Sequence, residues 1–429
     1  IEVAATYAHP CLSSQPQNFG SYTKYAAFKP TFNPTEWFYM DTTITYEYDT
    51  QNTNSKNTKT VYVYSNAQHM QLSQSYFTNS NGKNVLKFYR YPIDYSYIGT
   101  LSGTAFAMKE MTNRHIYNRP VEETNILVSS MQPTISQTEA LLHTYKLNNN
   151  QIVKDADYRL KNSNTGNNEE AISNYVYASI PGGQLVYDTR YELENQYTRY
   201  DLNQNLTELK QQDNTYAFRC PVNGDVWATT RHAGFDETAY SSFEHGNIPN
   251  DFTNWNYNNA NVFTDATPPP QRGTFNGDKC YKFSGTSDVI SNRIALNYYQ
   301  KFKFSFWGKN GTVSANVFYS GVFSSPGTNV PLRTGPTRMG WTYYEGYFTN
   351  ANFLQLNGTG MIDELRLYPA SARMETFVYR QGIGLWSKCN ENNQNTFWNY
   401  DEFQRVRLVS DQDGYILNKA EYKYLQQQN

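Results

Sequence analysis

The chain has 429 residues, of which 17% are charged, and its formal net charge is −2. A chain of this length can hold two to four domains with separate cores, and its near-neutral charge disfavours nucleic acid as a partner, which needs a basic face. No apolar run reaches the roughly 18 residues that a transmembrane helix needs, so we expect no transmembrane segment.

The aromatic content is high, with 38 Tyr, 24 Phe and 7 Trp. Aromatic residues and Thr suit the half-buried surface of a pleated sheet, and the many Asn and Gly residues suit the turns between strands. The composition therefore predicts a mainly β fold. The cysteines show no Cys-x-x-Cys spacing, which disfavours a zinc site, and both disulfides and buried free thiols stay open for Cys11, Cys220, Cys280 and Cys389.

Residues 1–130 form the first predicted region, which is rich in β-hairpins. Its first two strands alternate between polar and apolar residues, and an Asn-Gly turn precedes the fourth. Ala105–Arg114 is the best candidate for a helix. The predicted strands are Thr43–Tyr48, Lys59–Tyr64, Gln71–Phe77, Val85–Tyr91 and Thr124–Ser129.

Two further regions, residues 131–235 and 371–429, carry an internal repeat. Tyr200-Asp201 and Tyr400-Asp401 each begin the same pattern and run into a polar turn. In the second region Tyr379, Tyr400 and Tyr422 follow one another at 21 and 22 residues. One strand-turn-strand unit per repeat buries its face only by stacking on its neighbours. Ser136–His143 fits either a short helix or an apolar strand.

Residues 236–370 predict a β-sandwich of the jelly-roll kind. In Lys301–Phe306 three Phe residues alternate with Lys and Ser, as expected for a strand with one buried face. Thr342–Phe348 and Asn352–Leu356 are later strands of the same sandwich. The whole chain is thus predicted to be hairpin repeats or a meander flanking a jelly roll.

The stretch from Tyr400 to Ile416 resembles the YD repeat of the Rhs family, with Arg405 at the family's arginine position and Gln204 and Gln404 at its glycine position. The order of the pieces is similar to that in the C-terminal part of very large Rhs-like surface proteins of Bacteroidota. This resemblance implies a secreted protein at the cell surface, exported by the type IX route in many relatives. It also implies two partners: the outer-membrane secretion machinery and other parts of the same large protein.

Residues 236–370 also resemble a carbohydrate-binding jelly roll. In such domains a Glu on the first strand and an Asp on the last strand hold a structural calcium ion, and the matching positions are Glu244 and Asp363. Alternatively, Glu244 is an ordinary edge residue, and Asp363 caps a strand or pairs with an arginine. Calcium prefers such carboxylate oxygens together with backbone carbonyls.

A glycan is the second ligand to consider, since sugar rings stack on aromatic side chains. Trp255 and Tyr257 lie in an Asn-rich stretch, so we predict that they form an exposed binding pair. Tyr319 is a further candidate. Trp307 and Trp341 adjoin predicted strands and are expected in the core.

The sequence contains none of the common catalytic motifs, such as Gly-x-Ser-x-Gly or His-Glu-x-x-His, and its six histidines are scattered singly. We therefore expect no catalytic residues and no enzyme activity, but a structural and adhesive scaffold segment. Three alternatives stay open: a polysaccharide-binding module, an export substrate bound to secretion machinery, and a glycan hydrolase whose fold gathers two carboxylates or a histidine with a nucleophile.

Overall fold

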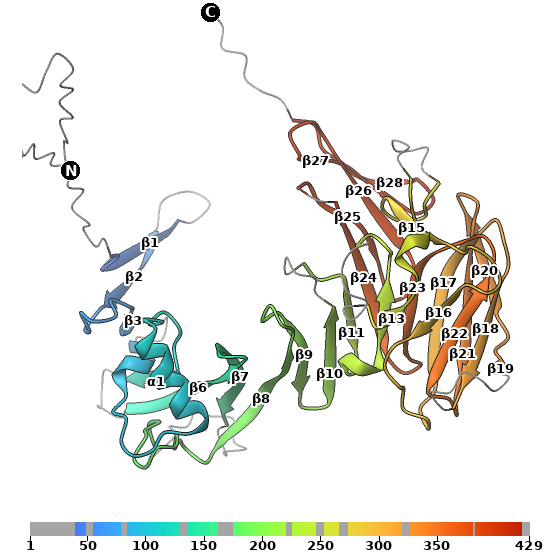
Figure 1. Cartoon of the computed structure of the whole chain (residues 1–429). Coiled ribbons are helices and arrows are strands. Elements are labelled where there is room, and N and C mark those ends of the chain that lie inside the picture. Colours follow the sequence, from blue (N-terminus) through green and yellow to red (C-terminus); the bar gives the residue numbers. More distant parts are fainter. Residues whose placement is uncertain are drawn as a thin grey trace, which may run out of the picture. The chain divides into compact units, whose positions relative to one another are not determined.

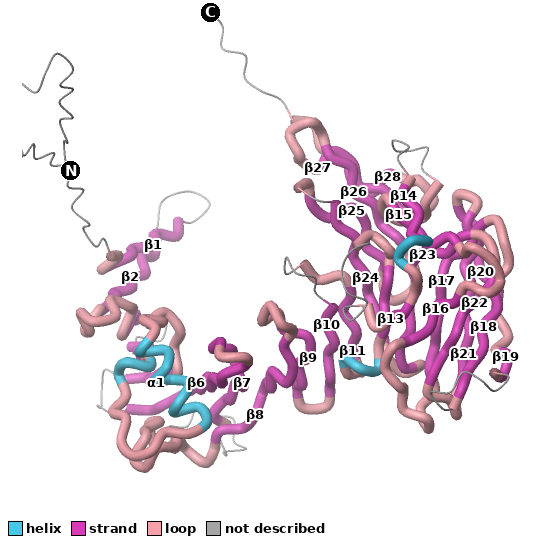
Figure 2. Tube along the Cα trace, in the orientation of Figure 1, coloured by secondary structure: helices cyan, strands magenta, loops and turns pink. Residues whose placement is uncertain are grey.

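The computed structural model describes residues 39–48, 55–78, 84–128, 135–161, 175–219, 225–245, 253–265, 273–319, 327–380 and 382–422. The chain is mainly β, and α1 (Gly103–Asn113) is the one α-helix within these ranges (Figure 2). It divides into two compact units, residues 1–87 with 127–134 and residues 88–126 with 135–429. No helix in the described ranges is long and apolar enough to cross a membrane.

The first unit contains antiparallel hairpin strands that pair in chain order, with Ile44 opposite Lys59 and Tyr62 opposite Ser75. This pairing confirms the strands predicted from the sequence, although Ile44 and Tyr46 of the first strand are exposed. The first 38 residues of the predicted N-terminal region lie outside the described residues. The strands are β1 (Thr42–Tyr48), β2 (Ser55–Val63), β3 (Gln74–Thr78) and β4 (Asn84–Arg90).

In the second unit α1 packs on the sheet, with Met108 and Met111 buried against Leu142. The helix predicted at Ala105–Arg114 is therefore confirmed. The helical alternative for Ser136–His143 is wrong, because this segment belongs to the long strand β6, which pairs with β7 from Leu141 onward. The strands here are β5 (Glu122–Val128), β6 (Ile135–Asn148), β7 (Gln151–Leu160) and β8 (Tyr191–Tyr200).

The same antiparallel sheet continues with strands that are far apart in the sequence. β11 pairs with β24, placing Thr230 opposite Met374, and residues 232–372 lie between these two neighbours in the chain (Figure 1). In sheet order these strands are β9 (Leu206–Gln211), β10 (Asn214–Arg219), β11 (Ala228–Arg231), β24 (Arg373–Arg380), β25 (Gly384–Cys389), β26 (Asn395–Tyr400), β27 (Val406–Asp411) and β28 (Ile416–Lys419).

Residues 239–369 form two further sheets, which face each other as a sandwich. One has the order β14 (Val262–Thr264), β15 (Lys279–Lys282), β23 (Met361–Pro369), β17 (Phe302–Lys309), β21 (Trp341–Phe348) and β20 (Arg333–Arg338), with β12 (Ala239–Ser241) beside β23. The other has the order β13 (Trp255–Asn256), β16 (Val289–Asn292), β22 (Phe353–Gly358), β18 (Val313–Phe318) and β19 (Thr328–Asn329). Short 3-10 helices are η2 (Pro92–Asp94), η3 (Phe235–Glu237) and η5 (Asn259–Asn261).

The sandwich core explains the alternation in β17. Phe302, Phe304 and Phe306 are fully buried and belong to one cluster with Leu354 and Leu356 of the opposite sheet. Each such side chain stabilises the fold by about 1.5–3 kcal/mol relative to an exposed one. The strand predicted around Lys301–Phe306 is thus confirmed, and its buried face is the interior of the sandwich.

The two copies of the Tyr-Asp pattern form the same turn. The Oδ1 atom of Asp201 accepts hydrogen bonds from the backbone N–H groups two and four residues later, both at 2.8 Å. Asp401 does the same at 2.9 and 3.0 Å. Gln204 and Gln404 adopt left-handed φ angles of 67° and 61° within these turns. The repeat is therefore structural as well as sequential.

Candidate functional site

Strand β23 lies where the sandwich meets the hairpin sheet, and it carries three buried charged residues, Asp363, Glu364 and Arg366. The pairing of β23 with β17 shifts register between Ser305 and Trp307, and Glu364 has a φ angle of 52°. Such a β-bulge turns side chains away from their normal alternation. The bulge gives Asp363 and Glu364 different surroundings, although both are fully buried.

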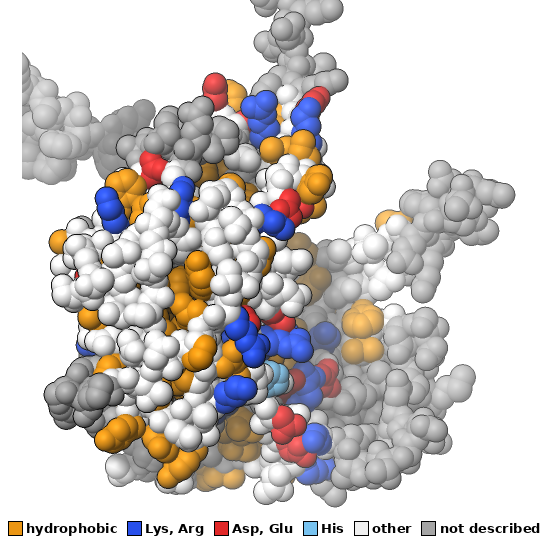
Figure 3. All heavy atoms as spheres, turned by 90° about the vertical axis from the view of Figure 1, so that its right-hand side faces the viewer, with side chains coloured by type: hydrophobic (Ala, Val, Ile, Leu, Met, Phe, Trp, Pro, Cys, Tyr) orange, Lys and Arg blue, Asp and Glu red, His pale blue; other side chains and the backbone are white. Residues whose placement is uncertain are grey.

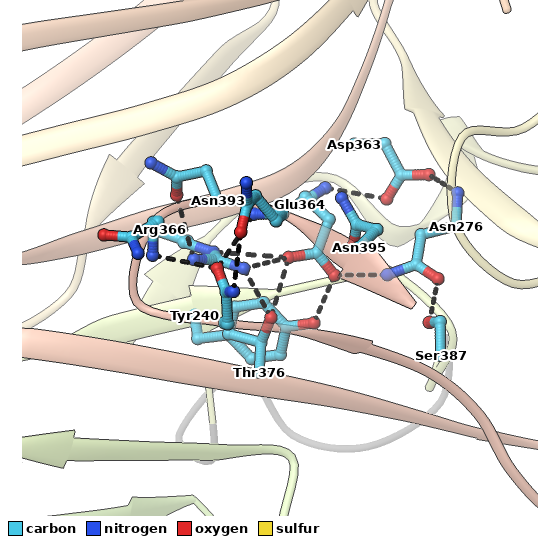
Figure 4. A network of polar contacts seen from close by, with 12 residues as sticks. Tyr240, Asn276, Asp363, Glu364, Arg366, Thr376, Ser387, Asn393 and Asn395 are labelled. Atoms are coloured by element: carbon cyan, nitrogen blue, oxygen red, sulfur yellow. Dashed lines mark hydrogen bonds and ion pairs between the residues drawn. The ribbon is translucent and has the colours of Figure 1, made fainter. Parts of the chain in front are cut away.

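Glu364 accepts four side-chain donors. Its Oε1 atom accepts hydrogen bonds from the hydroxyl of Tyr240 at 2.7 Å and the amide of Asn276 at 2.6 Å (Figure 4). Its Oε2 atom accepts from Nη2 of Arg366 at 3.1 Å and from the hydroxyl of Thr376 at 3.0 Å. A carboxylate can be buried at acceptable cost only when it is paired and hydrogen-bonded in this way.

The same network connects elements on both sides of the junction. Asn276 belongs to the loop before β15 and accepts a hydrogen bond from the hydroxyl of Ser387 on β25. Arg366 donates to Thr376 on β24 at 2.6 Å and to the side chain of Asn393 at 3.0 Å. The buried polar groups of the sandwich are therefore satisfied by residues of the hairpin sheet (Figure 4).

Burial also determines the protonation state of the two cysteine thiols near this network. Cys280 and Cys389 are both free and buried, and burial raises the pKa of the Cys389 thiol to about 12. Burial likewise raises the pKa of Cys280. Both thiols stay protonated at neutral pH and are inert. Cys11 and Cys220 lie outside the described residues.

Glu244 and Asp363, the predicted calcium ligands, lie on either side of one loop. Asp363 accepts a hydrogen bond from the backbone N–H of Asn276 at 3.0 Å, and Glu244 accepts from those of residues 278 and 279 at 2.7 Å each. Burial raises the pKa of Asp363 well above its usual value, and the charges of Glu364 and Glu244 raise it further. The loop thus brings two carboxylates, Glu244 and Asp363, against the same short stretch of backbone.

The residues present fit a hard cation by their chemistry. A Cβ at Gly277 would lie 2.2 Å from Oε1 of Glu244, so only glycine lets this carboxylate approach the loop backbone. Carboxylate and backbone oxygens are the ligands that calcium takes. Within the described ranges, no three His, Cys, Asp or Glu side chains gather as a metal-binding group. Further ligands would therefore come from backbone carbonyls and water.

The predicted exposure of Trp255 and Tyr257 is wrong. Trp255 is fully buried on β13 and belongs to the sandwich core, where Tyr257 packs edge-on against Phe243 and Tyr281. The surrounding asparagines suggested an exposed loop, but the sandwich buries Trp255 completely and Tyr257 partly. The same burial places Trp307 and Trp341 in the core, as the sequence predicted.

Other aromatic residues of the sandwich are exposed instead. Tyr299 is 87% exposed and makes an edge-to-face contact with Tyr298, and Tyr319 is 69% exposed. The backbone N–H of Asn350 donates to the carbonyl of Tyr298. The backbone N–H of Asn352 donates to the carbonyl of Phe318, which precedes Tyr319. On the face that Figure 3 shows, uncharged groups cover most of the surface and the hydrophobic side chains lie in separate groups.

His143 forms a close pair with an aspartate. Its Nδ1 atom lies 2.6 Å from Asp157, and its Nε2 atom lies 3.3 Å from Glu123. Lys154 and Tyr197 contact the same aspartate at 2.7 Å each. Since both ring nitrogens face carboxylates, this imidazole has no nitrogen left to activate a nucleophile.

No family model matches this chain, and no curated protein matches it either. One solved structure, a glycoside hydrolase family 43 arabinoxylan arabinofuranohydrolase from Bacillus subtilis in complex with cellotetraose, is 9% identical, and the match covers 76% of this chain and 78% of that chain with a TM-score of 0.18. Another, TcdB2-TccC3-TEV, is 9% identical over 82% of this chain and 21% of that chain, with a TM-score of 0.20. Likenesses this weak carry no argument about fold or function.

The sequence analysis missed Glu364 and Arg366 as the centre of the junction. One signal was present, because charged residues interrupt the apolar strand Ile362–Pro369. Charges in a buried strand are rarely tolerated without partners. The partners Tyr240 and Asn276 lie far away in the sequence, so a local pattern could not identify them.

Proposed function

We propose that this chain is a structural and adhesive scaffold segment of a large, secreted, Rhs-like cell-surface protein, in which hairpin repeats carry a jelly-roll sandwich and perform no catalysis. The proposal includes export by the type IX route. Its partners are other parts of the same large protein or the outer-membrane secretion machinery.

The pairing of β11 with β24 carries this proposal. The sandwich is inserted between two strands that are neighbours in the sheet, so the sheet continues past the insertion without a break. The buried pair of Glu364 and Arg366 then fastens the insert to β24 through Thr376. Buried polar contacts of this kind fix the orientation of the sandwich relative to the sheet. A fixed orientation suits a domain that a scaffold presents to its surroundings.

Repeated tyrosines support the framework. The hydroxyl of Tyr200 donates to the carbonyl of Lys154 on the neighbouring strand at 2.6 Å, and that of Tyr400 donates to Leu385 at 2.7 Å. Each tyrosine thus connects its own turn to the previous strand. This arrangement stiffens a sheet whose units contact only their neighbours.

A structural calcium ion between Glu244 and Asp363 belongs to the same proposal. It would offset the buried negative charge of these carboxylates and hold the loop around Gly277 against β23. When bound, the ion would supply charge neutralisation and coordination only, which suits a structural role in a secreted protein.

Two experiments test the scaffold. Antibodies against the sandwich should label intact cells of the native source, and protease treatment of those cells should remove the signal. A protein found only inside lysed cells would contradict the cell-surface role. Mass spectrometry of the native protein should also find these residues within a longer polypeptide, and a free-standing chain of 429 residues would contradict it.

The rigidity of the junction can be measured separately. Spin labels at Thr334→Cys on the sandwich and Glu402→Cys on the sheet, in a background with Cys11→Ser and Cys220→Ser, should give one narrow distance distribution. Replacement Glu364→Gln should broaden it. A broad distribution before that replacement would mean that the sandwich is only tethered.

Polysaccharide binding by the sandwich is the second candidate, and the exposure of Tyr298, Tyr299 and Tyr319 favours it. Exposed tyrosines can stack on sugar rings and donate hydrogen bonds. Binding to a glycan array should disappear in Tyr299→Ala and persist in Tyr39→Ala, which removes an exposed tyrosine of the hairpin strands. Equal binding by both variants would exclude this surface.

A further inference from the structure

Two cavities lie where the sandwich faces the C-terminal hairpins, and Trp386 lines both. The first has a volume of about 280 Å³ and lies between the loop at Gly277–Lys279 and strand β24, with Arg380 on its wall. The second has a volume of about 240 Å³ and lies between Phe275 and strands β26 and β27. Gly277 also lines both cavities, and the two together are hereafter called the junction groove.

A β-bulge places Trp386 in this groove. Val378 pairs with Ser387 and Tyr379 pairs with Leu385, which leaves Trp386 as the extra residue of β25. Regular alternation would turn it away from the side of Ser387, which faces the sandwich. The bulge instead brings the indole to that side. Bulges that re-aim a side chain are frequent next to binding sites.

The second cavity combines aromatic rings with polar groups. Phe397 stands opposite both Ser387 and Ser410 in the sheet, and Asn399 follows it on the same face. The side chains of Asn399 and Ser410 make no hydrogen bond to any described residue, and both are half-buried at the cavity wall. They can therefore donate to and accept from a ligand.

Charge narrows the choice of ligand. Among the described residues that line the second cavity, Asp411 alone is charged, whereas acidic and basic side chains balance in the first cavity, where Glu244 and Asp278 face Lys279 and Arg380. A strongly charged ligand would find no matching excess charge. A ligand with apolar ring faces and many hydroxyl groups matches the aromatic walls and the amide and hydroxyl groups together.

We propose that the junction groove binds a neutral oligosaccharide, with one sugar ring stacked on Trp386 in the second cavity and hydrogen-bonded by Asn399 and Ser410. The next sugar units follow the groove into the first cavity, where Lys279 and Arg380 contact their hydroxyl groups. The second cavity is smaller than the roughly 300–1,000 Å³ of sites for drug-sized ligands, which suits a single ring. Neither the sandwich nor the hairpins alone contain this site.

This site is separate from the exposed tyrosines at Tyr298 and Tyr299, and it does not depend on where the protein is located. The test uses the full chain and four neutral tetrasaccharides as probes: maltotetraose, cellotetraose, xylotetraose and mannotetraose. Saturation-transfer NMR identifies a bound probe, and titration calorimetry gives its Kd. We expect binding of at least one probe in the micromolar to millimolar range.

Matched variants locate the bound sugar. Trp386→Ala should weaken the Kd about ten-fold or more, as loss of a central aromatic contact does, and Trp386→Phe should restore part of the affinity. The double variant Asn399→Ala with Ser410→Ala should weaken binding without removing a ring. Trp398→Ala is the control, because Trp398 lies between Phe397 and Asn399 and so points to the opposite face of β26.

The outcomes separate this site from the alternatives. Absence of binding by all four probes would overturn the proposal, and so would binding that Trp398→Ala or Tyr299→Ala reduces more than Trp386→Ala does. Thermal unfolding of each variant checks that it is folded. If Trp386→Ala does not fold, Trp386→Phe and the double variant at Asn399 and Ser410 decide the result.

Discussion

Glu364 and Arg366 form an ion pair with 3.1 Å between Oε2 and Nη2, and their side chains are 1% and 2% exposed. The pair lies on one strand of the sandwich, yet its remaining hydrogen bonds reach residues of the adjoining sheet, including Thr376. Buried pairs of this kind add little net stability, but the loss of one partner leaves an uncompensated charge. The junction therefore depends on both residues.

Arg366→Met should destabilise the chain strongly. It leaves the Glu364 carboxylate buried without its cation, at a cost of about 3–5 kcal/mol. Urea unfolding measures the change. The control is Arg373→Met, because Arg373 is 68% exposed in its pair with Glu391 and such surface pairs contribute about 1 kcal/mol or less. Equal losses in both variants would contradict the buried network.

Calcium should stabilise the chain through Glu244 and Asp363. The pKa of Asp363 is raised by burial, so its charged form lowers stability as the pH rises above the usual value of 3.8. At neutral pH without calcium, Asp363→Asn should therefore be more stable than the parent chain. Calcium at about 100 times its Kd should stabilise the parent by about 2.7 kcal/mol and leave the variant unchanged.

The measurement is thermal unfolding in EDTA, in calcium and in magnesium. Magnesium should have a smaller effect, since it demands a stricter geometry than calcium. Glu391→Gln removes a half-buried carboxylate that pairs with Arg373, and it should leave the calcium response intact. The same response in Asp363→Asn as in the parent would place the ion elsewhere.

Local patterns predicted most of the strands but not the junction. Alternation in Lys301–Phe306 was enough, because a strand with one buried face shows alternating apolar and polar residues. Thr43–Tyr48 also lies in a strand, although its residues Ile44 and Tyr46 are exposed. The polar surroundings of Trp255 were misleading, since the ring is buried by a distant sheet. Glu364 gains its partners only after β11 and β24 have paired, and no short stretch of sequence contains that pairing.

The pair of His143 and Asp157 should make stability depend on pH. Burial alone would lower the pKa of His143, but hydrogen bonds to Asp157 and Glu123 raise it above the usual 6.5. The stabilisation is therefore fully present below pH 6.5 and is lost as the pH rises through the folded-state pKa. For Asp157, burial is outweighed by hydrogen bonds from His143, Lys154 and Tyr197, so its pKa falls far below the usual 3.8. Its stabilisation is therefore fully present above pH 3.8 and is lost progressively as the pH falls below that value.

His143→Gln should accordingly lower the free energy of unfolding by about 1.5–3 kcal/mol at about pH 5, and by much less at about pH 9. Urea unfolding over this range gives the difference. His232→Gln, at an exposed histidine, should show no such dependence. A pH-independent loss in His143→Gln would mean that the imidazole acts only through packing.

Replacement of Gln404 by glycine should stabilise the last Tyr-Asp turn. Gln404 has a φ angle of 61°, and this left-handed conformation costs a residue with a side chain about 1–2 kcal/mol. Glycine adopts the same angle without that strain, but it loses about 0.5–1 kcal/mol more conformational entropy on folding. We expect Gln404→Gly to raise the Tm measured by calorimetry. Gln204→Gly should have little effect, because it also removes the hydrogen bond that Gln204 accepts from Asn148 at 2.9 Å. A lower Tm for Gln404→Gly would show that this turn does not need a left-handed residue.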